Sequence, residues 1–103
     1  MTGWVKVGPL SDLGEEDVQR FDFGARTFAI YRAGGSVYAT DGLCTHEQAH
    51  LCDGLVMDHV IECPMHNGRF DIRTGRALRA PAHVDLKTYP AKIEGDVIFV
   101  LVD

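Results

Sequence analysis

Apolar side chains recur along this chain in short runs, and glycine-containing turns separate the runs. The runs are rich in β-branched and aromatic residues, which is typical of strands. The strands that this pattern predicts are Trp4–Val7, Val18–Phe23, Thr27–Arg32, Val37–Thr40, Val60–Cys63, Arg69–Ile72, Leu86–Ile93 and Val97–Val102. Many short strands with turns such as Gly34-Gly35 between them predict an all-β fold, an antiparallel β-sandwich or small barrel.

The same pattern indicates which side chains form the core: Phe28, Ile30, Val37, Tyr38, Ile98 and Val100. Helix is expected in one place only. Ser11 can cap a helical turn over Ser11–Asp17, where acidic residues follow the cap. A solvated acidic loop is an equally good interpretation of this segment.

The length of 103 residues, 46% of them hydrophobic, indicates a single domain over residues 1–103. No run of about 18 apolar residues is present, so no membrane-spanning helix is expected. The start, Met1–Val7, lacks the layout of a secretory signal. We therefore expect a soluble, cytoplasmic protein. The net charge of −5 argues against nucleic acid or an anionic membrane as the target.

Two mixed pairs of cysteine and histidine carry the candidate chemistry. Cys44-Thr45-His46 and Cys63-Pro64-Met65-His66 are separated by sixteen residues. Two thiolates and two imidazoles can hold one zinc ion or a 2Fe–2S cluster. Zinc fingers of the Cys2His2 kind place cysteine with cysteine and histidine with histidine, whereas each pair here is mixed. The mixed pairs favour the cluster, with both thiolates on one iron and both imidazoles on the other. A zinc-binding structural or interaction module stays open as the alternative.

The pattern C-T-H followed by C-P-x-H resembles the motif of the Rieske iron–sulfur family. Segments on either side are similar too: Gly35–Gly42, His66–Asp71 with Thr74-Gly75, Pro81–Tyr89 and Glu94-Gly95-Asp96. The resemblance therefore covers nearly the whole chain. It implies the Rieske fold, with a cluster-binding subdomain over approximately residues 41–79 inserted in the larger sheet. It also implies one Rieske-type [2Fe-2S] cluster, with the ligands Cys44, His46, Cys63 and His66.

Small, low-potential members of this family are the ferredoxin components of bacterial aromatic-ring-hydroxylating dioxygenase systems. The resemblance implies a monomeric one-electron carrier, not an enzyme, in transient contact with a flavin-dependent ferredoxin reductase and a terminal aromatic-ring dioxygenase. The oxygenase chemistry itself needs a two-histidine, one-carboxylate iron site. His83-Val84-Asp85 offers only a fragment of such a site. A small Rieske subunit of an assimilatory nitrite reductase is the alternative carrier.

Departures from the high-potential members of the family concern the redox potential. Those members have a serine and a tyrosine where this chain has Gly68 and Phe70, and a disulfide at the positions of Ala49 and Met65. The absence of the serine, the tyrosine and the disulfide predicts a redox potential near the low end of the Rieske range, about −150 mV. The remaining cysteine, Cys52, is expected to be a buried or part-buried thiol rather than a fifth ligand.

Charged and apolar residues near the two pairs suggest surfaces. Residues 41–65 contain no lysine or arginine and five acids: Asp41, Glu47, Asp53, Asp58 and Glu62. Residues 66–80 contain four arginines, Arg69, Arg73, Arg76 and Arg79, against one acid, Asp71. The simplest interpretation is a solvated surface of mixed sign. A sharper hypothesis is that Glu47 and Asp53 lie near the cluster and steer a basic face of a partner. Leu51, Pro64, Met65 and Pro81 can form an apolar collar that keeps water from the sulfides. Ordinary loop packing is an equally good interpretation of Leu51 and Met65, and Pro64 and Pro81 are better interpreted as shaping the loops.

Overall fold

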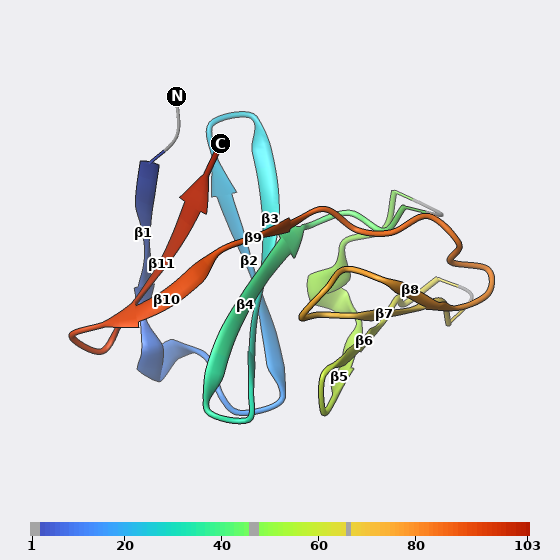
Figure 1. The fold of residues 1–103 in the computed structure, drawn as a ribbon, viewed down its shortest axis with the longest axis horizontal. Coiled ribbons are helices and arrows are strands. Elements are labelled where there is room, and N and C mark those ends of the chain that lie inside the picture. Colours follow the sequence, from blue (N-terminus) through green and yellow to red (C-terminus); the bar gives the residue numbers. More distant parts are fainter. Residues whose placement is uncertain (1–2, 46–47, 66) are drawn as a thin grey trace.

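The computed structural model describes residues 3–45, 48–65 and 67–103. Among these residues there are eleven strands, two 3-10 turns and no α-helix, which confirms the all-β prediction (Figure 1). The strands are β1 (Gly3–Pro9), β2 (Asp17–Phe23), β3 (Arg26–Ala33), β4 (Ser36–Asp41), β5 (Leu55–Met57), β6 (Val60–Glu62), β7 (Arg69–Asp71), β8 (Ala77–Arg79), β9 (Thr88–Tyr89), β10 (Ala91–Glu94) and β11 (Val97–Val102). The 3-10 turns are η1 (Leu10–Asp12) and η2 (Leu51–Asp53).

Two antiparallel sheets form the larger part of the molecule, in the strand orders β1-β11-β10 and β2-β3-β4-β9. They enclose one core of buried residues: Leu13, Phe28, Ile30, Val37, Ala39, Tyr89, Ile98, Val100 and Val102. On β11 buried and half-buried residues alternate, as they do when one face of a strand packs inward. The predicted core residues are buried with one exception. Tyr38 is half-buried, and its ring packs edge-on against His59, with 5.8 Å between the ring centroids.

A third antiparallel sheet, β5-β6-β7-β8, lies beside the other two (Figure 1). Its inward residues belong to a second core, which comprises Ala29, Tyr31, Ala33, Cys44, Leu51, Val56, Ile61, Cys63, Phe70, Ile72, Ala82 and Leu86. Strand β3 supplies both cores, because Phe28 and Ile30 face one of them and Ala29 and Tyr31 face the other. The small sheet is thus packed on the back of β3.

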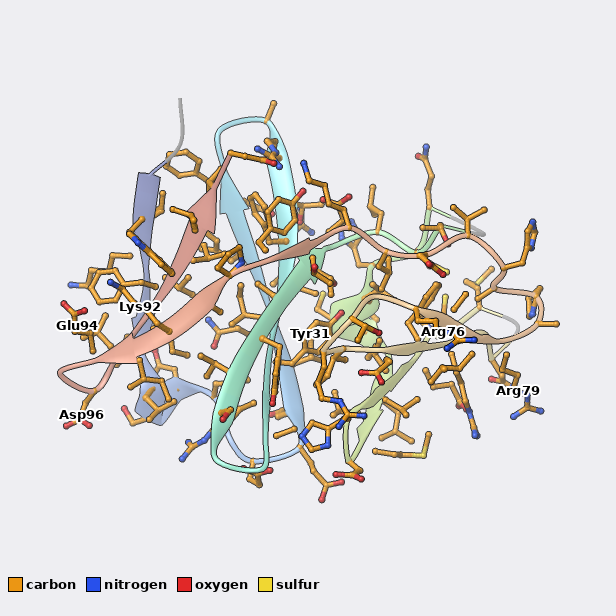
Figure 2. All side chains as sticks on the ribbon, in the orientation of Figure 1. Tyr31, Arg76, Arg79, Lys92, Glu94 and Asp96 are labelled. Carbon is orange, nitrogen blue, oxygen red and sulfur yellow. The ribbon has the colours of Figure 1, made fainter. Side chains whose placement is uncertain are left out.

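Tyr31 is the largest side chain that the second core buries completely (Figure 2). Its hydroxyl lies 2.8 Å from the Thr40 hydroxyl, which in turn donates to the carbonyl of Asp41. Burial raises the pKa of Tyr31 far above its ordinary value. The phenol therefore stays neutral, and its one polar atom is satisfied where β3 and β4 meet the small sheet.

The structure departs from the predicted elements at four places. The strand predicted over Leu86–Ile93 is two strands, β9 and β10, because Pro90 has no N–H for a sheet and the chain changes sheet there. Strands β5 and β8 have no counterpart among the predicted strands. Of the two interpretations of Ser11–Asp17, the helical turn is wrong, because η1 covers Leu10–Asp12 after Pro9 and no side chain caps it. The exposed turn that follows, with Glu15 and Glu16, agrees with the acidic loop.

The third sheet lies within the predicted subdomain, and the boundaries at residues 41 and 79 stay a prediction. No helix in the described ranges is both long enough and apolar enough to cross a membrane.

Candidate functional site

Two loops of similar construction hold the predicted cysteine ligands. Cys44 follows β4, and its N–H donates to the carbonyl of Ala49 at 2.9 Å. Cys63 follows β6, and its N–H donates to the carbonyl of Gly68 at 2.7 Å. Each cysteine amide therefore closes its loop onto the residue five positions further on. The predicted ligands His46 and His66 belong to the same two loops but lie outside the described residues.

The two cysteines lie in the same buried region. Cys44 is 5% exposed and Cys63 is 0% exposed, and both belong to the second core. None of the three cysteines, all of which the structure describes, forms a disulfide. The backbone N–H of Met65 donates to Sγ of Cys63 at 3.5 Å. An amide directed at a cysteine sulfur stabilises the negative thiolate that an iron ligand must be, so this donor set fits an iron–sulfur cluster.

A third segment, residues 80–86, closes over both loops. Thr45 Oγ1 donates to the carbonyl of Val84 at 2.6 Å, which connects this segment to the first loop. Ala82 packs against the second loop: a Cβ built on Gly68 would lie 3.0 Å from the Cβ of Ala82. The peptide bond between Ala80 and Pro81 is cis. The two cysteine loops are therefore held by hydrogen bonds of their own and by contact with a common third segment.

The fragment His83-Val84-Asp85 belongs to this third segment, and its polar groups have structural partners. Asp85 Oδ1 accepts a hydrogen bond from the N–H of Ala77 at 2.9 Å, and His83 Nδ1 lies 2.9 Å from the carbonyl of Pro81. Both groups are used to shape the loop, and they do not converge as a second iron site would require.

The four residues considered for the apolar collar differ in exposure. Leu51 is 0% exposed and belongs to the core, so it does not line the surface around the loops. Met65, by contrast, is 45% exposed, Pro64 is exposed as well, and Pro81 is half-buried. Leu51 packs in the same core as Cys44 and Cys63, and a role for this side chain in excluding water from the cluster stays a prediction.

Cys52 is half-buried, which confirms the prediction of a part-buried thiol. Burial, and after it the neighbouring Asp53 carboxylate, raise the pKa of the Cys52 thiol. Cys52 lies in η2, outside the two loops, which leaves Cys44 and Cys63 as the cysteines that the two loops present.

The structure places one of the two predicted steering acids away from the loops. Asp53 is exposed at the end of η2, in the neighbourhood of Arg20 on β2. Glu47 lies outside the described residues. Steering by acidic residues stays a prediction, and its test now depends on Glu47 more than on Asp53.

Sequence reasoning missed the contacts that fix the loops. Thr45 could have been noticed, because a hydroxyl stands between the two ligands of the first pair. Its acceptor on Val84 and the donor on Met65 are backbone atoms, which every residue has, so no sequence signal could have identified them.

Comparison with known proteins gives a family. A family profile described as the Rieske [2Fe-2S] domain matches residues 3–90. The ferredoxin component of the naphthalene 1,2-dioxygenase system of Pseudomonas aeruginosa is 44% identical over 94% of this chain and 93% of that protein.

Solved structures agree in fold. The ferredoxin-like chain in the complex of reduced oxygenase and oxidized ferredoxin of carbazole 1,9a-dioxygenase superposes with a TM-score of 0.90 at 36% identity, over 94% of this chain and 91% of that chain. A putative nitrite reductase small subunit from Mycobacterium tuberculosis has a TM-score of 0.88 at 20% identity, over 100% of this chain and 97% of that chain. The second likeness shows the fold alone.

Proposed function

Because this chain belongs to the Rieske [2Fe-2S] domain family, we propose that it is the ferredoxin component of an aromatic-ring-hydroxylating dioxygenase system. It carries single electrons from a flavin-dependent ferredoxin reductase to a terminal oxygenase. The observation that carries this proposal is the relative in the naphthalene 1,2-dioxygenase system, which matches almost end to end. That relative is a carrier component and not a catalytic one, so we assign no catalytic residue to this chain.

Membership of the family implies one Rieske-type [2Fe-2S] cluster, which accepts and donates one electron at a time when it is bound. The ligands we propose are Cys44 and Cys63 on one iron and His46 and His66 on the other. The burial of both cysteines and the similar closure of their loops support this assignment. In this assignment, the backbone N–H of Met65 donates to Sγ of Cys63 and stabilises its thiolate.

The terminal oxygenase is the better supported of the two partners. A ferredoxin of the same fold is found in a complex with its oxygenase in the carbazole 1,9a-dioxygenase system. The flavoprotein reductase and the monomeric state follow from the family resemblance, and a cytoplasmic location stays a prediction. Contacts with both partners are expected to be brief, since a shuttle must leave one partner before it meets the other.

The two alternative functions, a nitrite reductase subunit and a zinc-binding module, are less well supported. The nitrite reductase subunit shares the fold at 20% identity, and the dioxygenase ferredoxin shares 44% of its sequence with this chain. A zinc-binding module does not agree with membership of a [2Fe-2S] family.

Two variants test the ligand assignment. Cys63→Ser is expected to abolish the reddish-brown colour and the paramagnetic signal of the dithionite-reduced protein. Cys52→Ser, the matched control, is expected to keep both, because Cys52 lies outside the two loops. Metal analysis should give two irons per chain in the wild type. A colourless wild-type protein with stoichiometric zinc would overturn the assignment.

A reconstitution tests the function. The wild-type chain is expected to restore turnover to a flavin reductase and a terminal aromatic-ring oxygenase that are inactive when mixed without it. Dioxygen uptake by the purified chain alone would contradict the assignment as a carrier. Restored activity with a nitrite reductase, in the absence of oxygenase coupling, would favour the alternative.

A further inference from the structure

The outer face of the sheet β5-β6-β7-β8 carries a groove that the cluster assignment does not use. Val56, Ile61 and Phe70 point into the second core, so their neighbours along the strands point outward. A groove of about 370 Å³ lies on this outer face. Its lining residues are Met57, Val60, Arg69, Leu78 and Arg79.

The floor of the groove is apolar and its wall is cationic. Leu78 is 49% exposed, which is high for a leucine in a strand, and Met57 and Val60 are half-buried beside it. Exposed apolar side chains gathered in a concavity typically mark a binding surface. The two arginines add the polar rim of such a surface.

The register of the strands sets the two arginines against each other. Arg69 on β7 is the direct cross-strand partner of Arg79 on β8. Like charges directly opposite destabilise a sheet unless a negative group lies near them. Glu62 supplies a negative group to only one of the two arginines, because its carboxylate accepts a hydrogen bond from Nε of Arg69 at 2.8 Å. The side chain of Arg79 is exposed and has no hydrogen bond or ion pair with the described residues (Figure 2).

The groove adjoins the second cysteine loop. Strand β6 ends at Glu62, the residue before Cys63, and β7 begins at Arg69, the residue after Gly68. Two of the four strands that line the groove, β6 and β7, thus carry this loop. A protein segment seated in the groove lies beside the loop through which we propose that electrons pass.

We propose that this groove is the docking site for an acidic segment of the terminal oxygenase. One carboxylate of that segment lies between Arg69 and Arg79, and an adjacent apolar side chain packs on Met57, Val60 and Leu78. Charge complementarity selects the occupant: a chain of net charge −5 offers an acidic partner few positive sites, and here two guanidinium groups flank an apolar floor. The inference rests on the proposed function, which supplies the oxygenase as partner.

Two charge reversals test the arginine wall. Arg79→Glu reverses a charge that lines the groove. Arg76→Glu is the matched control, because Arg76 is also exposed, has no side-chain ion pair with the described residues, and does not line the groove. Both variants change the net charge equally, so any difference between them reports the groove and not long-range attraction.

The measurement is the reoxidation of dithionite-reduced chain by the oxygenase of the naphthalene 1,2-dioxygenase system, used as the probe. For Arg79→Glu we expect the half-saturating concentration to rise about tenfold, as for the loss of one central interface contact. The rate at saturation and the midpoint potential are expected to stay unchanged. For Arg76→Glu we expect a change of less than about twofold.

A second pair tests the apolar floor. Leu78→Ser removes an apolar contact from the groove and is expected to raise the half-saturating concentration severalfold. Ile93→Ser is the control, because Ile93 is an exposed aliphatic residue on β10 and does not line the groove. It is expected to leave the concentration unchanged.

The outcomes separate the inference from the proposed function. If wild-type chain with a reducible cluster does not reduce the oxygenase, the partner is wrong and the docking site falls with it. If the wild type reduces the oxygenase and Arg79→Glu behaves like Arg76→Glu, the groove alone is overturned. A shift in midpoint potential confined to Arg79→Glu shows a structural role at the cluster and also overturns the docking site. A higher unfolding temperature of Arg79→Glu is expected in either case, because the variant removes the like charge opposite Arg69.

Discussion

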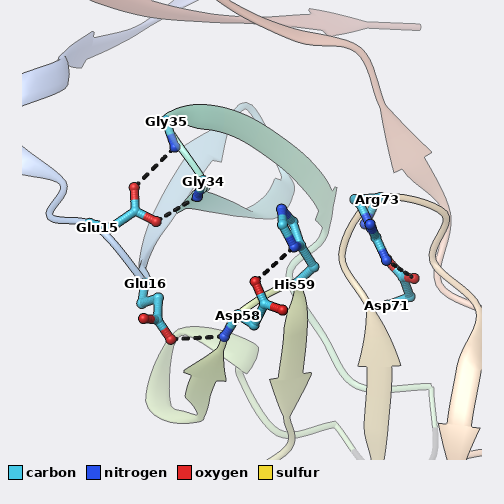
Figure 3. Close-up of polar contacts among 8 residues, drawn as sticks. All are labelled: Glu15, Glu16, Gly34, Gly35, Asp58, His59, Asp71 and Arg73. Carbon is cyan, nitrogen blue, oxygen red and sulfur yellow. Dashed lines mark hydrogen bonds and ion pairs between the residues drawn. The ribbon is translucent and has the colours of Figure 1, made fainter.

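Glu16 and Asp58 join the larger sheets to the small sheet through one hydrogen bond. The N–H of Asp58, in the turn between β5 and β6, donates to Oε2 of Glu16 at 2.8 Å (Figure 3). Both residues have left-handed backbone conformations, with φ values of 55° at Glu16 and 57° at Asp58. Such values are uncommon for residues other than glycine, so the turn on each side is held in an unusual shape by its surroundings.

Removal of this bond should loosen the β5–β6 hairpin. We choose Glu16→Asn, because asparagine tolerates a left-handed conformation and its shorter side chain cannot reach Asp58. The expected loss is below about 1 kcal/mol of unfolding free energy, since the freed N–H is exposed to water. Faster amide exchange in β5 and β6 should accompany it. Asp12→Asn, which removes an exposed acid on η1, is the control and should change neither quantity.

Glu15 predicts a dependence of stability on pH. Its carboxylate accepts hydrogen bonds from the N–H groups of Gly35 and Gly34 in the turn between β3 and β4 (Figure 3). These bonds hold the pKa of Glu15 below its ordinary value. A lowered folded-state pKa contributes stability that is present above the unfolded-state pKa of about 4.3 and is lost as the pH falls through the folded-state pKa.

Glu15→Gln is therefore expected to lower the unfolding temperature at pH 7 and to approach the wild type as the pH falls below about 4.5. Thermal unfolding of both proteins from about pH 7 to about pH 3.5 measures the gap between their unfolding temperatures. Asp12→Asn again serves as the control. A gap of constant size across this range would show that the carboxylate charge is not what the two glycine amides recognise.

Particular strands show how far the sequence specifies the fold. The apolar pattern predicts strand β11 with its correct bounds, Val97–Val102, because its run of apolar residues is uninterrupted and follows a glycine turn. Strand β8 is not predicted, because its three residues, Ala77–Arg79, have little strand propensity and are held only by pairing with β7. Long-range pairing of this kind leaves no local pattern.

The candidate site likewise has features that the sequence predicts and features that only the folded chain shows. The sequence singles out Cys44 and Cys63, because ligand chemistry requires particular residue types at particular spacings, and the structure places both in one core. Their role as ligands stays a prediction. The hydrogen bond from Thr45 to Val84 crosses 39 residues and ends on a carbonyl, so only the folded chain shows it. The full burial of Leu51 is also visible only in the folded chain, since the direction of a loop side chain depends on the backbone of η2.

Gly68 is expected to tolerate no side chain. A Cβ at this position would lie 3.0 Å from the Cβ of Ala82 and 3.3 Å from its backbone nitrogen. Gly68→Ala should therefore destabilise the protein by about 1–3 kcal/mol, the usual cost of overpacking. Urea unfolding of the cluster-loaded protein measures the loss. Gly14→Ala is the control, because a Cβ on Gly14 would meet nothing within 4 Å beyond its chain neighbours.

A double variant identifies the cause of the Gly68 effect. Ala82→Gly removes the Cβ that the new methyl group would meet, so Gly68→Ala should cost less in that background than in the wild type. The contact with the backbone nitrogen of Ala82 remains, and the recovery is expected to be partial. Equal costs in the two backgrounds would show that the close approach to Ala82 does not limit this position.

Phe70 offers the sharpest test of the expected redox potential. It is 0% exposed and belongs to the same core as Cys44 and Cys63. As phenylalanine it cannot donate a hydrogen bond to a cysteine sulfur, which agrees with a wild-type midpoint near −150 mV, about the low end of the Rieske range. Phe70→Tyr adds such a donor, and one hydrogen bond of about 1 kcal/mol corresponds to a rise of about 40 mV for a one-electron couple.

Redox titration of the wild type and Phe70→Tyr measures the rise. Phe99→Tyr is the matched control, because Phe99 lies on β11, in the sheet that does not carry the cysteine loops, and its potential should equal that of the wild type. A wild-type midpoint above zero would refute the low-potential assignment. An unchanged midpoint in Phe70→Tyr, together with a lower unfolding temperature, would mean that the new hydroxyl is buried without reaching a sulfur.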